Sequence, residues 1–112
     1  MKIYGIKNCD TMKKARLWLD TQGLSVEFID YKKDGLSPEL LTEFVQELGW
    51  QALINKRGTT YRKLDEKVKD TMDEKSAIAV MLENPSIIKR PLLVKDGKYL
   101  LGFKAETYQE FV

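Results

Sequence analysis

The single cysteine of this 112-residue chain, Cys9, stands in the sequence "NCDTM" between a short apolar run and an amphipathic segment that predicts a helix. A thiol after a strand and just before a helix lies where open α/β sheets bind ligands and where helix N–H groups favour an anion. A helix terminus and basic neighbours together lower the pKa of a thiol and make it nucleophilic. Cys9 is therefore our candidate for a reactive thiolate, with a small buried apolar side chain as the alternative.

Two arginines and a proline are the other candidates for chemistry. Arg57 lies in "NKRGTTYRKL", where Gly58 predicts a turn, and Arg90 directly precedes Pro91. If both guanidinium groups converge on Cys9, they stabilise its thiolate and hold a carboxylate or oxyanion by paired hydrogen bonds. The alternatives are ordinary exposed charges for the arginines and the start of an edge strand for the proline.

Composition excludes several other kinds of site. The chain has no histidine and one cysteine, which removes the usual general base, an internal disulfide and a multi-thiolate zinc site. No Asp/Glu cluster has the spacing of a calcium loop, so we expect no bound metal. The formal charge of +2 argues against general electrostatic binding to nucleic acid and leaves room only for a small local basic pocket. The sequence has no basic recognition helix, so we expect no direct binding to nucleic acid. Without a long apolar run or a targeting segment, we expect a cytoplasmic protein with no membrane partner.

Hydrophobic periodicity predicts the elements that position these residues at the start of the chain. Residues 2–5 and 25–30 predict strands, and residues from about 11 to 22 predict a helix that Gly23 ends. A strand, a helix and a strand at this spacing form a right-handed βαβ unit with parallel strands.

The end of the chain again has the pattern of strands. The segment "RPLLVKDGKYLLGF" has two apolar runs around Asp96 and Gly97, which predicts a hairpin. A helix from about 104 to 112 should close the chain and bury Tyr108, Phe111 and Val112.

The middle of the chain predicts helices. Ser37 and Pro38 start one helix, which ends at Gly49, and residues 74–83 predict another. Between them the sequence is polar and irregular, with a short helical turn expected at either side of "KRGTTYRKL". We therefore expect a single domain over residues 1–112, with an inserted helical subdomain at about 37–84. The order β-α-β, helical insertion, β-β-α predicts an α/β fold with a thioredoxin-like mixed sheet.

Four segments, "YGIKNCDTMKKA", "NKRGTTYRKL", "PSIIKRPLLV" and "LLGFK", resemble the arsenate reductase-related, Spx-like family of the thioredoxin superfamily, and most closely its YffB-type members. The resemblance spans essentially the whole chain. It implies a thioredoxin-like fold, Cys9 as nucleophile and Pro91 as a cis-proline. It also implies that Arg57 and Arg90 match two of the three arginines that surround the oxyanion in arsenate-reducing members.

The chain departs from the family pattern in two places. The third arginine falls at or beside Phe103, and Lys104 is a partial substitute because a lysine cannot reproduce bidentate geometry. Met12 stands where Spx regulators have the second cysteine of a Cys-x-x-Cys switch, which excludes an internal disulfide. Both departures favour thiol chemistry with one cysteine.

The resemblance to YffB-type proteins implies a glutathione-dependent thiol–disulfide oxidoreductase with an external resolving thiol. Cys9 would be the catalytic residue, with no bound cofactor, glutathione as co-substrate and glutaredoxin as a further partner. The alternatives are an arsenate reductase coupled to glutathione and glutaredoxin, and a non-catalytic Spx-like regulator that binds RNA polymerase. Asp10 is also a candidate helix cap, and Lys7 or Lys13 a further cation for glutathione carboxylates. The residues expected to bind substrate or glutathione are Asn8, Asp10, Arg57, Arg90, Pro91 and Lys104.

Overall fold

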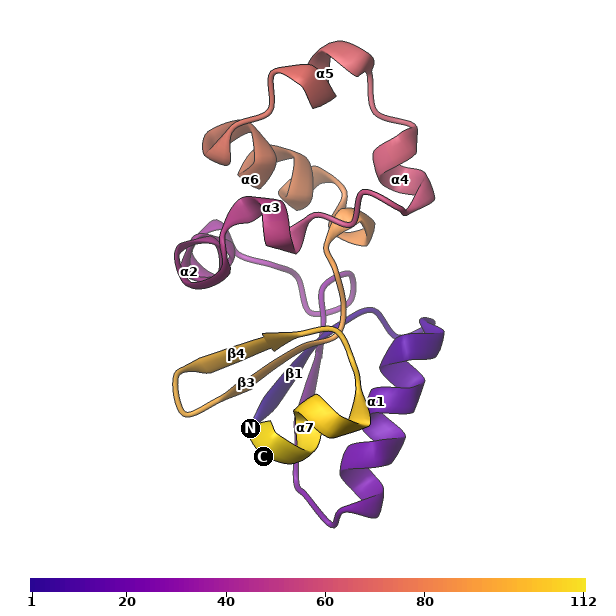
Figure 1. Ribbon diagram of the computed structural model, residues 1–112. Helices are drawn as coiled ribbons and strands as arrows, with labels where there is room; N and C mark the ends of the chain where they lie inside the picture. The colour runs from indigo at the N-terminus through magenta and orange to yellow at the C-terminus, as the bar shows by residue number, and fades with distance from the viewer. The chain divides into compact units, whose positions relative to one another are not determined.

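The computed structural model describes residues 1–112, which form two compact units (Figure 1). The sheet unit comprises Met1–Gly35 and Arg90–Val112, and the helical unit comprises Leu36–Lys89. The helical unit thus interrupts the sheet unit in the sequence and extends a few residues beyond the expected 37–84.

The sheet unit contains a four-stranded mixed sheet in the order β2-β1-β3-β4. Its strands are β1 (Lys2–Gly5), β2 (Glu27–Asp30), β3 (Leu92–Lys95) and β4 (Lys98–Leu101). β1 and β2 are parallel, whereas β3 runs antiparallel to both β1 and β4. This mixture of parallel and antiparallel pairs confirms the predicted fold class.

Helix α1 (Asp10–Thr21) connects the two parallel strands, and Gly23 follows its C-cap residue Gln22, as expected. Gly23 has a φ of +72°, and its N–H donates to the carbonyl of Asp20 at 2.9 Å. The N–H of Leu24 donates to the carbonyl of Leu19 at 3.2 Å. These two bonds form a Schellman motif, in which glycine adopts the left-handed conformation without a Cβ penalty.

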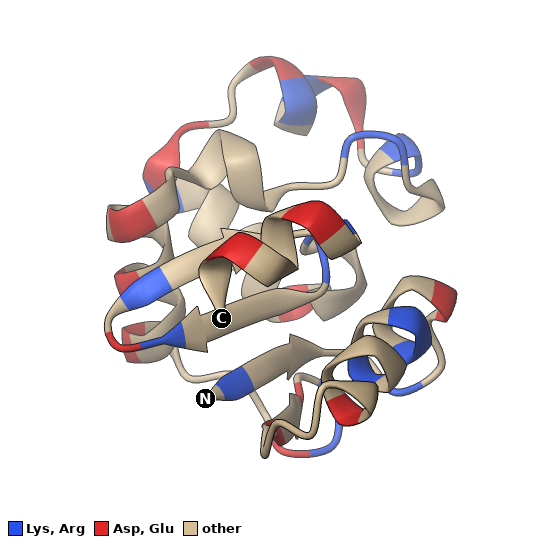
Figure 2. Ribbon diagram, turned by 60° about the horizontal axis from the view of Figure 1, so that its bottom comes forward, with Lys and Arg blue, Asp and Glu red and all other residues tan.

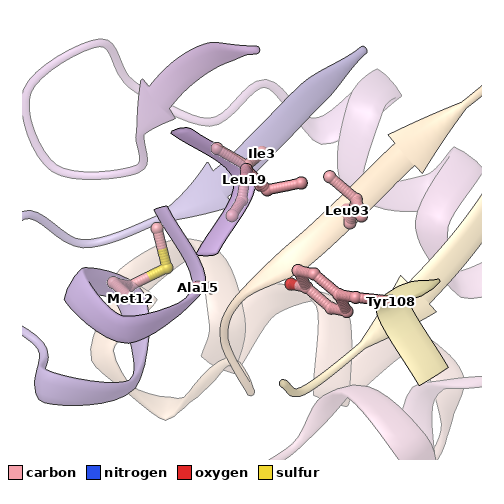
Figure 3. Close-up of a cluster of buried hydrophobic side chains, with 6 residues drawn as sticks. All are labelled: Ile3, Met12, Ala15, Leu19, Leu93 and Tyr108. Carbon is pink, nitrogen blue, oxygen red and sulfur yellow. The ribbon is translucent and has the colours of Figure 1, made fainter. Parts of the chain in front are cut away.

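Helix α1 and the C-terminal helix α7 (Ala105–Phe111) pack on one face of the sheet. The rings of Trp18 and Phe103 meet Tyr108 edge to face, at centroid distances of 5.7 and 4.8 Å. The expected burial of Tyr108 is confirmed, whereas Phe111 and Val112 are only half-buried at the margin of the same core. The buried cluster, drawn in Figure 3, consists of Ile3, Met12, Ala15, Leu19, Leu93 and Tyr108.

The hairpin between β3 and β4 turns at the expected pair of residues. Asp96 and Gly97 both have positive φ, at 50° and 75°. Two consecutive left-handed residues are typical of the type I′ turn, whose twist matches that of the flanking strands.

The helical unit begins with α2 (Pro38–Leu48), where the Ser37 hydroxyl accepts a hydrogen bond from the Leu40 N–H at 3.1 Å. The expected helix over residues 74–83 is also present. The short helical turns expected at either side of "KRGTTYRKL" are present, over Trp50–Leu53 before it and Glu66–Asp70 after it. A further short helix, which was not expected, lies inside this stretch, where Gly58 is the N-cap of a helix that starts at Thr59. The remaining elements are α3 (Trp50–Leu53), α4 (Thr59–Arg62), α5 (Glu66–Asp70), α6 (Glu74–Glu83) and the 3₁₀ turn η1 (Pro85–Ile87). None of the helices has the length and apolar character needed to cross a membrane.

Candidate functional site

Cys9 is the N-cap residue of α1, with extended backbone angles of φ −125° and ψ 127°. Its carbonyl accepts the first helical hydrogen bond, from the Lys13 N–H at 3.0 Å. Since β1 ends at Gly5, the thiol lies in the loop at the carboxyl end of a parallel strand. The side chain is half-buried. The predicted position of the cysteine in the fold is therefore confirmed.

The surroundings of the thiol favour its ionised form. Burial by itself raises the pKa of Cys9, but the backbone N–H of Met12, the hydrogen-bonded Arg90 guanidinium and the N–H of Thr11 together lower that pKa below its ordinary value. The two amides belong to the first turn of α1, where unpaired N–H groups carry partial positive charge. Helix and arginine thus act in the same direction, which is the setting of a reactive cysteine.

Strand pairing explains how Arg90 reaches Cys9 from the far end of the chain. β3 runs antiparallel to β1 with Leu92 opposite Tyr4, so the residues just before β3 lie at the end of β1 that leads into the Cys9 loop. The Arg90–Pro91 peptide bond is cis, as the family resemblance implies. Pro91 is buried, and its carbonyl accepts a hydrogen bond from the Gly102 N–H at 2.8 Å.

Arg57 lies in the helical unit, in the turn that leads into α4. Its side chain is exposed, and its backbone N–H donates to Asn55 Oδ1 at 3.2 Å. The turn predicted from Gly58 is present. The approach of the Arg57 guanidinium to Cys9 stays a prediction.

The segment "LLGFK" supplies a core aromatic side chain where arsenate-reducing relatives were expected to have an arginine. The Phe103 ring packs against Tyr108, so this position contributes to the hydrophobic core. Lys104 is exposed and is the N-cap residue of α7, where its carbonyl accepts from the Tyr108 N–H at 3.0 Å. Its part in binding stays a prediction.

Four polar residues beside Cys9 are exposed, namely Lys7, Asn8, Asp10 and Lys13. The expectation that Asp10 caps α1 is wrong, because Cys9 occupies the N-cap position and Asp10 lies in the first turn. A carboxylate in the first turn still interacts favourably with the helix dipole. The proposed contacts of these side chains with a substrate stay predictions.

Asp30, at the carboxyl end of β2, belongs to the surroundings of the site but was not singled out from the sequence. It is 6% exposed and is the one buried charged residue. Burial raises the pKa of this carboxyl, but backbone N–H groups of Lys32, Lys33 and Lys7, with the charge of Lys32, lower it overall. The signal in the sequence was the broken alternation of "SVEFID", where a charge occupies an inward position.

Tyr31, which follows Asp30, is also buried, and its ring stacks on Tyr4 with centroids 6.2 Å apart. Burial raises the pKa of its phenol above the ordinary value, as does Tyr4 to a smaller extent, whereas Arg90 opposes the shift. Tyr31 and Cys9 therefore both feel the charge of Arg90.

Charges of both signs are interspersed along the elements of both units (Figure 2). Helix α1 carries Lys13, Lys14 and Arg16 together with Asp10 and Asp20. No group of three or more His, Cys, Asp or Glu residues is arranged to hold a metal ion. The groups that lower the pKa of Cys9 are the first turn of α1 and Arg90.

Comparison with known proteins shows close relatives over the whole chain. A YFFB protein of known structure is 50% identical, with a TM-score of 0.92, and the match covers 97% of this chain and 96% of that chain. An arsenate reductase-related protein from Brucella melitensis is 51% identical, with a TM-score of 0.82 and coverage of 98% and 92%. An uncharacterized protein of Haemophilus influenzae is 49% identical, with coverage of 96% of this chain and 94% of its own length. The thioredoxin-like mixed α/β fold is therefore shared with solved relatives.

More distant relatives carry two different functional names. A global transcriptional regulator Spx of Streptococcus agalactiae is 26% identical over 94% of this chain and 77% of its own length. An arsenate reductase from Vibrio cholerae is 26% identical, with a TM-score of 0.85, and the match covers 100% of this chain and 98% of that chain. The family model of the ArsC family matches residues 4–111. The chain belongs to the ArsC family.

Proposed function

We propose that this protein is a glutathione-dependent thiol–disulfide oxidoreductase that uses Cys9 as its only redox-active group. The observation that carries the proposal is a half-buried thiol at a helix N-terminus, hydrogen-bonded by Arg90, in a chain with no second cysteine. A thiolate of this kind attacks disulfide sulfur atoms. It needs an external thiol to complete a cycle, and we place that cycle in the cytoplasm, where glutathione keeps thiols reduced.

The proposed cycle has two exchange steps. The Cys9 thiolate attacks the glutathione sulfur of a mixed disulfide, the S–S bond breaks, and the substrate leaves as a thiolate that takes a proton from water. Cys9 is then joined to glutathione. The thiolate of a second glutathione attacks the glutathione sulfur of this adduct, forms oxidised glutathione and releases the Cys9 thiolate. Glutaredoxin is a second candidate for this resolving step.

Substrate binding in this proposal uses the cations and polar groups around the loop. Arg90 is adjacent to the thiol and has the planar geometry that pairs with a carboxylate. Asn8, Asp10, Lys7 and Lys13 are exposed beside it. Arg57, Pro91 and Lys104 complete the proposed binding residues.

The test is reduction of the mixed disulfide between glutathione and 2-mercaptoethanol. The oxidised glutathione that forms is measured through the coupled oxidation of NADPH. We expect turnover that depends on glutathione and disappears in Cys9→Ser. Mass spectrometry of the wild-type protein after incubation with oxidised glutathione should show one adduct on Cys9 that reduced glutathione removes. Absence of both turnover and adduct would refute the proposed function.

An arsenate reductase is the nearest alternative, and membership of the ArsC family supports it. Arg90 beside Cys9 suits an oxyanion, but Phe103 packs into the core where a third arginine was expected. We therefore expect weak arsenate turnover in an assay coupled to glutathione and glutaredoxin. Turnover comparable to that of an arsenate-reducing family member would favour this alternative.

A non-catalytic regulator that contacts RNA polymerase is the alternative from another class. The similarity to Spx of Streptococcus agalactiae supports it, whereas Met12 removes the second thiol of a dithiol switch. Recovery of RNA polymerase with both the wild-type protein and Cys9→Ser, without disulfide reductase activity, would favour this alternative.

A further inference from the structure

The buried carboxylate of Asp30 links the end of β2 to the loop that carries Cys9. One oxygen, Oδ1, accepts hydrogen bonds from the backbone N–H groups of Lys32 at 2.8 Å and Lys33 at 3.3 Å. The other oxygen, Oδ2, accepts from the backbone N–H of Lys7 at 3.2 Å. The first two bonds close a local turn, but the third joins residues that are 23 positions apart.

The bond to Lys7 is the one that a local turn does not need. An Asp that only closed its own turn would satisfy its carboxylate within the next three residues and with water, as surface Asx turns do. Here the carboxylate is 6% exposed, and a buried charge is tolerated only when its oxygens have hydrogen-bond partners. The Lys7 N–H therefore completes the set of donors, and the loop is held to the carboxylate.

Lys7 lies two positions before Cys9, and the strand before it is fixed from the same side. The N–H of Tyr31 donates to the Gly5 carbonyl at 2.8 Å, which continues the parallel pairing of β1 and β2. At the other end, Cys9 is the N-cap of α1. The short connection from Gly5 to Cys9 is thus held by the sheet, by Asp30 and by the helix.

We propose that Asp30 is a positioning residue for Cys9, which acts through the Lys7 N–H to keep the thiol against the first turn of α1 and the Arg90 guanidinium. It does not touch the substrate. The inference rests on the proposed function only in taking Cys9 as the reacting group.

Two effects of Asp30 on the thiol have opposite signs, which makes the proposal testable. The negative charge of the carboxylate disfavours a nearby thiolate, so simple removal of the charge would make Cys9 more reactive. Loss of positioning would make it less reactive, because the thiol would leave the donors that favour ionisation. Positioning and charge therefore predict opposite changes in the same measurement.

The experiment measures the rate of iodoacetamide alkylation of Cys9 against pH in the wild type, Asp30→Asn and Asp34→Asn. Asn has nearly the same shape as Asp, but its amide nitrogen cannot accept a hydrogen bond. The variant therefore cannot accept from the Lys7 N–H and from the N–H groups of Lys32 and Lys33 at the same time. We expect Cys9 in Asp30→Asn to react roughly tenfold more slowly at acidic pH, the effect expected when its displaced thiolate loses one hydrogen bond. The pH profile should move to higher pH.

Asp34→Asn is the matched control. Its exposed side chain belongs to the same turn and accepts from the Asp30 N–H at 2.8 Å, without a bond to Lys7. We expect its rate to stay within about twofold of the wild type, since exposed surface substitutions have small effects. A faster or unchanged rate in Asp30→Asn, or an equal loss in both variants, would overturn the proposal.

A measurement on the wild-type protein covers the case in which Asp30→Asn does not fold. The amide proton shift of Lys7 should follow the titration of the Asp30 carboxyl in NMR spectra at acidic pH, and an amide that does not respond would overturn the proposal. This result is independent of glutathione turnover. A titrating Lys7 amide in a protein without reductase activity would refute the proposed function and leave the positioning of the loop intact.

Discussion

Replacement of Arg90 by glutamine removes the cation that is hydrogen-bonded to the Cys9 thiol. We expect the pKa of Cys9 to rise, because the thiolate loses its charged partner and keeps only the amides of the first helical turn. Arg90→Lys should fall between the wild type and Arg90→Gln, since an ammonium keeps the charge but not the planar donor geometry.

The size of the effect follows from the kind of contact that is lost. A hydrogen bond to a charged group contributes roughly 1.5–3 kcal/mol. The thiol is half-buried, so partial solvent screening places its loss at the lower end of this range. About 1.4 kcal/mol corresponds to tenfold in an ionisation equilibrium. At acidic pH, where the thiol form predominates, we therefore expect Arg90→Gln to be alkylated about tenfold more slowly.

The assay is the second-order rate of alkylation by iodoacetamide across the pH range, with circular dichroism to verify folding. Arg16→Gln is the matched control, because it removes the same group from α1. The Arg16 guanidinium lies over the Phe28 ring, 4.3 Å from its centroid. The reasoning is refuted if Arg90→Gln keeps the wild-type pH profile, or if Arg16→Gln moves it equally.

Three further predictions concern stability. Tyr108→Phe should lower the free energy of unfolding by less than about 1 kcal/mol or increase it, because the buried hydroxyl has no hydrogen-bond partner. Tyr108→Ala should lower it by about 3–5 kcal/mol in urea unfolding. Equal losses in the two variants would contradict the conclusion that the ring, and not the hydroxyl, stabilises the core. Gly5→Ala should cost about 1–3 kcal/mol, because a Cβ at Gly5 would collide with Met12 Sδ, and Met12→Ala should relieve most of this loss in the double variant. Because the pKa of Asp30 is lowered in the folded protein, its carboxylate stabilises the fold above the unfolded-state pKa of about 3.9, and this stabilisation is lost as pH falls through the folded-state pKa. In urea unfolding from neutral to strongly acidic pH, the free energy of unfolding should therefore fall less in Asp30→Asn than in the wild type.

The sequence predicts those parts of the fold that local patterns determine. The Schellman end of α1 at Gly23 and the type I′ turn at Asp96 and Gly97 follow from residues that tolerate positive φ. The position of Cys9 before α1 follows from periodicity on either side of it. Helix α4 was not predicted, because the polar stretch around Gly58 has no apolar periodicity from which to place a four-residue helix.

The candidate site was harder to predict because its contacts join distant parts of the chain. Arg90 reaches Cys9 through the antiparallel pairing of β1 with β3. The residue types made Arg90 a candidate, but periodicity could not show that it converges on Cys9. Asp30 was missed because the broken alternation of "SVEFID" indicates a charge at an inward position but not its partner, a backbone N–H 23 positions away. Sequence patterns report side-chain polarity, whereas this bond depends on where the main chain of the loop passes.

Position 12, in the first turn of α1, can hold either the resolving cysteine of a Cys-x-x-Cys pair or a large core side chain, but not both. Here it holds Met12, which packs in the core. Its side chain is 1% exposed and packs in the cluster with Ile3 and Ala15, beneath the strand end at Gly5. The second position of a Cys-x-x-Cys pair is therefore a core position in this protein, and a methionine fills it with more volume than a cysteine would. Cys9, three residues earlier, remains half-buried beside exposed neighbours. In the proposed cycle the second thiol must arrive from solution, and the exposed side of the Cys9 loop is where glutathione would meet the adduct.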